Sequence, residues 1–354
     1  MFYILMIGLL IVIAEAKFAP AGKFNTDYLS KESTTAINGI FVFLVFLCHA
    51  IGYVTVDPSI DVQWTTMHSY MGQLVVVPFL FFSGYGIMCS IKAKGTTYVK
   101  GMFKKRFLPL LLHFDIAVFL YFLLNLIFIK RSYSLKDTLL AFLTWTSIGN
   151  SNWYIGAMLL LYITVIVSFL IFRKYKLPAL VTMTLLTGII ILLIIRTDKP
   201  SYWYNTMLVF TFGMWYGYLK DEIDLIVMKN SFTYLFALLM ATGVFVVLFD
   251  RRHSRTIYHS IWSIAFAAII VLVMMKVKIG NPILSTLGKH VFSIYILQRI
   301  PMLLIRHFGI TDNSFNFILL SFPATLIIAF VFDKAISYID KKLFFREKKK
   351  EIKQ

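Results

Sequence analysis

Residues 153–172, WYIGAMLLLYITVIVSFLIF, form an apolar run without a single charged side chain. A helix needs about 20 such residues to cross the roughly 30 Å of hydrocarbon in a bilayer. Comparable runs recur on both sides of this one along the whole chain. The run length therefore predicts membrane-spanning helices rather than the shorter core helices of a water-soluble domain.

The composition points to the same class. Of the 354 residues, 59% are hydrophobic and only 15% are charged, whereas about a quarter are charged in ordinary soluble domains. A soluble fold cannot bury this much apolar surface, because its core volume is limited. The excess must face lipid.

The apolar runs predict an all-α, polytopic integral membrane helical bundle with 10–11 transmembrane helices. The first run is short, and Ala14-Glu15-Ala16 resembles a signal-peptidase site, but no basic segment precedes it. We therefore expect a retained first span or an interfacial helix there. The predicted spans are 2–16, 38–56, 71–91, 107–129, 153–172, 178–195, 204–219, 231–249, 258–275, 287–305 and 315–338.

The basic residues are unevenly divided between the two sides of such a bundle. Alternate loops carry 24 Lys and Arg on one side and nine on the other. The positive-inside rule places the richer set in the cytoplasm, which predicts a multi-pass protein of the plasma membrane with a cytoplasmic C-terminus. The net charge of +18 thus reflects topology and contact with anionic membrane lipids, and we expect no nucleic-acid partner. Cys48 and Cys89 are too few for a disulfide framework or a cysteine-based metal site, so no metal is expected.

Few ionisable side chains fall inside the apolar runs, and each is a functional candidate because its burial in lipid is unfavourable. His49 lies eleven residues after Asn38, about 16 Å along a helix, and must point into the bundle. It could be a structural residue, a proton relay or a general base. The whole set is His49, His113, Asp115, Lys289, His290, Arg299 and Asp333.

Two further segments combine polar and small residues. Ser83 and Tyr85 lie among glycines in mid-span, which suits either close helix packing or a ligand. Lys104, Lys105 and Arg106 stand together at a helix entrance. They suit the phosphates of a nucleotide-type donor, and equally lipid headgroups.

Five short segments stand out by their order and spacing: NGIFVFLVFLCH (38–49), FFSGY (81–85), FKKRFLP (103–109), NWY (152–154) and SIYIL (293–297). Together they resemble the acyltransferase-3 family of bacterial membrane proteins. The resemblance covers roughly residues 29–340, so we expect a membrane acyltransferase domain there, an N-terminal hydrophobic segment and linker in 1–28, and a basic cytoplasmic tail in 341–354.

The resemblance implies a membrane-bound O-acyltransferase. No cofactor is expected to be permanently bound; acetyl-CoA or another acyl-CoA would donate an acyl group to a hydroxyl of a cell-surface polysaccharide, its precursor or a lipid-linked sugar. His49 would be the catalytic base. The donor would be held by Lys104, Lys105 and Arg106, while Ser83, Tyr85, Asn152 and Trp153 would orient the substrate or the oxyanion.

The chain departs from the family pattern at three places. Asn38 stands where members commonly have Arg or Lys, Pro109 stands where a second Arg is favoured, and Gln298 stands where many have a histidine. Two alternatives therefore remain: a polysaccharide-related transporter or flippase, and an inactive family member within a surface-polymer assembly machine.

Overall fold

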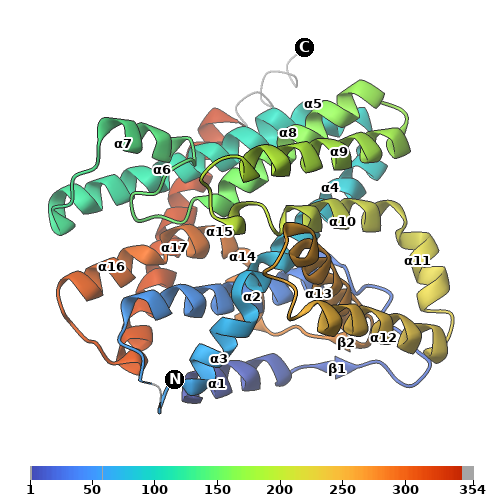
Figure 1. Cartoon of the computed structure of the whole chain (residues 1–354), viewed down its shortest axis with the longest axis horizontal. Helices are drawn as coiled ribbons and strands as arrows, with labels where there is room; N and C mark the ends of the chain where they lie inside the picture. Colours follow the sequence, from blue (N-terminus) through green and yellow to red (C-terminus); the bar gives the residue numbers. More distant parts are fainter. Residues whose placement is uncertain (1, 58, 345–354) are drawn as a thin grey trace, which may run out of the picture.

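The computed structural model describes residues 2–57 and 59–344, and helices make up nearly all of its regular structure. The predicted all-α helical bundle is confirmed. Figure 1 shows α2 and α14 near the middle of the view, with α6 to α9 above them and α1 and the two strands below. The helices are α1 (Phe2–Ile13), α2 (Lys31–Ala50), α3 (Val62–Met71), α4 (Val77–Lys94), α5 (Thr96–Met102), α6 (Leu108–Leu124), α7 (Leu135–Phe142), α8 (Trp153–Phe172), α9 (Lys176–Ile195), α10 (Met207–Tyr218), α11 (Lys220–Val227), α12 (Ser231–Leu248), α13 (Thr256–Lys276), α14 (Pro282–Lys289), α15 (Val291–Leu297), α16 (Arg299–His307) and α17 (Ser314–Leu343).

Short 3₁₀ and π-helical turns extend several of these helices. A single antiparallel ribbon pairs the two strands, which join the N-terminal linker to the end of α13. The turns are the 3₁₀ segments η1 (Ile51–Tyr53), η2 (Gly72–Val76) and η5 (Ser201–Trp203) and the π-helical segments η3 (Phe103–Phe107) and η4 (Asn125–Ile129); the strands are β1 (Lys17–Phe18) and β2 (Val277–Lys278).

Within the described residues, 8 helical segments are long and apolar enough to cross a membrane. The other three predicted spans take different forms. The first and the seventh are the helices α1 and α10, each of 12 residues, which is about 18 Å and shorter than the hydrocarbon layer. The tenth, predicted over 287–305, is broken into α14, α15 and α16. Pro301 explains the second break, because a proline nitrogen cannot donate to the carbonyl four residues earlier.

Helix α2 begins seven residues before the predicted span. The side chain of Ser30 caps it by accepting a hydrogen bond from the backbone N–H of Ser33, and the polar residues 31–35 form its first turns. His49 is consequently the last residue but one of α2. It lies about 27 Å along the axis from Lys31, near the far end of the helix rather than in its middle.

Glycines allow two pairs of helices to cross in direct backbone contact. A Cβ on Gly39 of α2 would lie 2.0 Å from the carbonyl oxygen of Leu284 in α14. A Cβ on Gly84 of α4 would lie 2.1 Å from the carbonyl oxygen of Phe210 in α10. These contacts fix α2 against α14 and α4 against α10, and so position the ends of α2 and α4 that carry polar residues.

Candidate active site

The ring of His49 lies at the end of α2, where the α-helix passes into η1. Trp64 of α3 holds this end in place, since its indole Nε1 donates to the carbonyl oxygen of Leu47 at 3.1 Å. The imidazole is half-buried, and its Nδ1 is buried without a hydrogen-bond partner. The ring thus faces protein rather than lipid and keeps a nitrogen available for proton transfer.

The break between α15 and α16 supplies the groups opposite His49. The ring of Tyr295 lies 6.1 Å from the imidazole, centroid to centroid. The side chains of Gln298 and Arg299 also interact with the imidazole. The amide of Gln298 is fixed by a hydrogen bond from Nε2 to the carbonyl oxygen of Tyr295, at 2.9 Å. The segment around this helix break therefore brings three polar side chains, Tyr295, Gln298 and Arg299, near the histidine.

A second layer lies behind Tyr295. Its ring makes an edge contact with Tyr154 of α8 at 5.5 Å. The hydroxyl of Ser83 on α4 lies beside Tyr154, and that of Ser151 lies beside Tyr295. Ser83 is thus linked to His49 through two side chains, Tyr154 and Tyr295.

Several buried polar atoms around His49 lack a partner among the described protein groups. Buried polar groups are almost always hydrogen-bonded in folded proteins, so this concentration of unpartnered atoms makes the surroundings of His49 the candidate site. The set contains donors and acceptors: His49 Nδ1, Ser151 Oγ, Tyr295 OH, Gln298 Oε1 and Arg299 Nε. We call these five residues the polar chamber.

Asn152 and Trp153 border the chamber in different ways. The amide nitrogen of Asn152 donates to the carbonyl oxygens of Thr144 and Thr146, at 2.7 and 2.8 Å, so this side chain shapes the loop that carries Ser151. Trp153 packs against Tyr154 at 5.9 Å and Tyr202 at 5.8 Å. It therefore contributes to an aromatic wall next to the chamber.

Tyr85 does not join this group. Its ring stacks on Phe81 and meets Tyr216 of α10, both at 6.4 Å, and its hydroxyl interacts with Cys89. The two neighbouring glycines differ as well, because Gly84 contacts α10 whereas a Cβ on Gly86 would meet nothing within 4 Å.

Lys104, Lys105 and Arg106 are exposed on η3, away from His49. Seven residues further along the same helical segment, His113 bonds Asp340 of α17 at 2.9 Å and contacts Phe292 of α15 at 5.9 Å. Phe292 precedes Gln298 by six residues, about 9 Å along the helix axis. The basic turn and the chamber therefore occupy different levels of the bundle.

Tyrosines connect these two levels. Tyr162 of α8 lies within electrostatic range of Arg106, and Tyr154 lies within range of Tyr162 and Tyr295. A sequence of phenolic rings thus leads from the basic turn to the chamber.

Another polar group lies on the other face of α15. Asp333 of α17 accepts hydrogen bonds from Ser293 and from the imidazole of His290. This carboxylate is therefore held by two hydrogen bonds across the helices. Among the described residues no group of three or more His, Cys, Asp or Glu side chains has the arrangement of a metal site.

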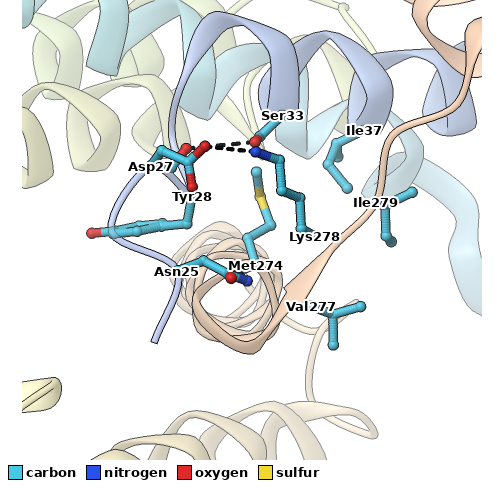
Figure 2. Close-up of a pocket in the computed structure, with 9 residues that line it drawn as sticks. All are labelled: Asn25, Asp27, Tyr28, Ser33, Ile37, Met274, Val277, Lys278 and Ile279. Atoms are coloured by element: carbon cyan, nitrogen blue, oxygen red, sulfur yellow. Dashed lines mark hydrogen bonds and ion pairs between the residues drawn. The ribbon is translucent and has the colours of Figure 1, made fainter. Parts of the chain in front are cut away.

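A pocket at the opposite end of α2 is closed by an ion pair. Figure 2 shows Lys278 reaching past Met274 to Asp27, with an Nζ to Oδ2 distance of 2.7 Å. This hydrogen bond lowers the pKa of Asp27, and the carboxylate raises the pKa of Lys278. The space, about 210 Å³ in all, is small and contains no free nucleophile, so it anchors the N-terminal linker rather than forming an active site.

Sequence reasoning assigned no role to four chamber residues. Gln298 was noted only as standing where many family members have a histidine. Tyr295 belongs to a quoted motif and Arg299 is an ionisable residue in an apolar run, which was a usable signal. Ser151 carried none, because a lone serine in a loop is commonplace.

The comparisons with known proteins give one match. A family model described as an acyltransferase domain matches residues 35–334, a range that contains His49 and every other chamber residue. No curated protein and no solved structure matches the chain.

Proposed function

The chain belongs to this family of membrane acyltransferases, and from that premise we propose that it moves an acyl group, acetyl in the first instance, from acyl-CoA to a hydroxyl of a cell-surface polysaccharide or its lipid-linked precursor. The observation that carries the proposal is the position of His49. Its Nδ1 has no hydrogen-bond partner among the described residues, and each of the four other chamber residues has one buried polar atom in the same state.

His49 acts as the general base. The acceptor hydroxyl gives its proton to the imidazole while its oxygen bonds to the acyl carbon. The carbon–sulfur bond then breaks, and the departing thiolate takes the proton back from the imidazolium. Atoms and charge balance without a metal or an oxidant.

The chamber suits a sugar as the acceptor. Its free atoms include both donors and acceptors, as a polyhydroxylated ring requires. Tyr154, Tyr295 and Trp153 offer aromatic faces nearby, and such amphipathic rings commonly pack against ligands that are partly apolar and partly polar. The hydroxyl of Ser83, beside Tyr154, would help to orient the acceptor.

The donor approaches from the basic turn. Lys104, Lys105 and Arg106 would bind the phosphates of CoA, and the row of tyrosines between Arg106 and Tyr295 supports passage of the acyl end toward His49. The distribution of Lys and Arg supports a plasma-membrane location with this turn and the C-terminus in the cytoplasm.

Purified protein in liposomes, radiolabelled acetyl-CoA and surface polysaccharide test the proposal. We expect alkali-labile acetyl ester on the polysaccharide, and a rate at least about 100-fold lower for His49→Ala, because a positioned base commonly contributes that much. His307→Ala, an exposed histidine on α16, is the matched control. Movement of polysaccharide without ester formation, or full activity in His49→Ala, contradicts the proposal.

The donor site has its own test. Replacing Lys104 and Lys105 by alanine should raise KM for acetyl-CoA with little change in kcat, because these residues bind phosphates away from the reacting atoms. Lys100→Ala, an exposed lysine one turn earlier, should leave KM unchanged. Equal KM values in all these variants would place the donor elsewhere.

A further inference from the structure

Arg299 brings a cation into the chamber without an internal counter-ion. Its guanidinium lies within electrostatic range of His49, Tyr121 and Tyr295 and interacts with the hydroxyl of Tyr53. In the part of the chain that the structure describes, the carboxylates that form ion pairs do so with other residues: Lys92, His113, Lys220, Lys278 and His290. None pairs with Arg299.

The position of this charge is unfavourable unless an anion is present during function. The side chain is only partly accessible, and its Nε is buried without a partner. Ionisable groups inside a membrane bundle normally pair with each other or with backbone carbonyls, and an arginine there stays charged. Tyrosine hydroxyls contribute dipoles, but no formal negative charge.

Asn38 lies too far from His49 to take the place of Arg299. It is eleven residues before His49 on α2, about 16 Å along the axis, whereas Arg299 lies within electrostatic range of the imidazole and directly follows Gln298, whose amide is fixed on Tyr295 beside His49. Among the described residues of the chamber, Arg299 is the arginine, and its Nε is buried without a partner.

We propose that Arg299 stabilises the negative charge that develops on the carbonyl oxygen of the acyl group when the acceptor hydroxyl attacks. The inference rests on the proposed function. As the oxygen–carbon bond forms and the proton passes to His49, the carbonyl π electrons move to oxygen; the guanidinium donates to this oxyanion. When the carbon–sulfur bond breaks, the carbonyl is restored and the charge leaves with the thiolate.

A role in the transition state predicts a specific kinetic pattern. Loss of one oxyanion-stabilising group commonly lowers kcat by about 100-fold to 1,000-fold. We therefore expect kcat of Arg299→Gln to fall by at least about 100-fold, with KM for acetyl-CoA and for polysaccharide within about threefold. Arg299→Lys keeps the charge but loses the planar fork, so its kcat should lie between those of Arg299→Gln and the parent.

A matched variant and a rescue distinguish this role from a structural one. Arg306 lies two turns later on α16, is exposed, and donates to the carbonyl oxygen of Tyr53 at 2.8 Å; Arg306→Gln should keep kcat within about threefold. Added guanidinium should restore part of the activity of Arg299→Ala, which a merely unfolded variant would not allow. The melting temperature of each variant in detergent shows whether it is folded.

The outcomes separate the two proposals. If the parent forms ester and His49→Ala does not, the proposed function stands, and Arg299 is then judged alone. Folded Arg299→Gln with kcat within threefold of the parent, an effect confined to KM, or Arg299→Ala that unfolds and gains nothing from guanidinium overturns the inference. A parent that forms no ester overturns both.

Discussion

The imidazole of His49 and the phenol ring of Tyr295 face each other at 6.1 Å, and both carry a buried polar atom without a partner. They come from α2 and α15, helices almost 250 residues apart along the chain. This pairing, rather than the histidine alone, defines the chamber, because Gln298 and Arg299 follow Tyr295 on the same chain segment.

Tyr295→Phe tests that pairing. The ring and its packing remain, but the free hydroxyl is removed, so we expect the transfer rate to fall about tenfold while the melting temperature stays the same. Tyr121→Phe is the control, because it should lower stability rather than the transfer rate. Its hydroxyl donates to the carbonyl oxygen of Ile296 at 3.0 Å, and losing that bond should cost about 1 kcal/mol of stability. If the two variants change rate and stability equally, the Tyr295 hydroxyl has no role in transfer that the Tyr121 hydroxyl lacks, which contradicts the prediction.

Gly84→Ala should prevent α4 and α10 from packing. The new Cβ would lie 2.1 Å from the carbonyl oxygen of Phe210, so the helices must separate, at a loss of about 3 kcal/mol or more. Gly86→Ala on the same helix meets nothing within 4 Å and should be tolerated. Thermal unfolding in detergent measures both, and a stable Gly84→Ala protein would mean that the crossing is not as close as described.

The membrane class and the inward position of His49 follow from sequence, because both depend on the long-range avoidance of charge in lipid. Helix ends do not follow from apolarity. The polar residues 31–35 form the first turns of α2, so a prediction from apolar residues alone starts this helix seven residues too late. The cap at Ser30 was the local signal that apolarity missed.

The chamber itself is a tertiary feature. A continuous apolar stretch predicted one helix over 287–305, whereas the structure breaks it at His290 and Gln298. The second break places Arg299 at the start of α16, within electrostatic range of His49. Such a placement depends on how α15 and α16 pack against α2, which neither hydropathy nor the spacing of motifs reports.

Asn152→Asp should disturb the loop beside the chamber. The amide donates two hydrogen bonds to carbonyl oxygens, and a carboxylate of the same shape can donate none. We expect a loss of stability of about 2 kcal/mol or more, because two buried carbonyls and a charge would face each other. Asn316→Asp on α17, where the side chain is exposed, should change stability little. If Asn152→Asp instead lowers only the transfer rate, the residue contacts the substrate rather than the loop.

Asp27→Asn should have a small effect on stability that depends on pH in a defined way. The bond to Lys278 lowers the pKa of Asp27 and raises that of Lys278. The unfolded values are about 3.9 and 10.4. The carboxylate contribution is thus fully present above pH 4 and disappears as the pH falls through the lower folded pKa, while the ammonium contribution disappears only above pH 10. Both side chains are partly exposed, so the pair contributes at most about 1 kcal/mol. Melting temperatures of the parent and Asp27→Asn should therefore differ by a constant small amount between about pH 5 and 9 and converge toward pH 3. A difference that grows as the pH falls below 5 would have the wrong sign and would exclude the ion pair as its source.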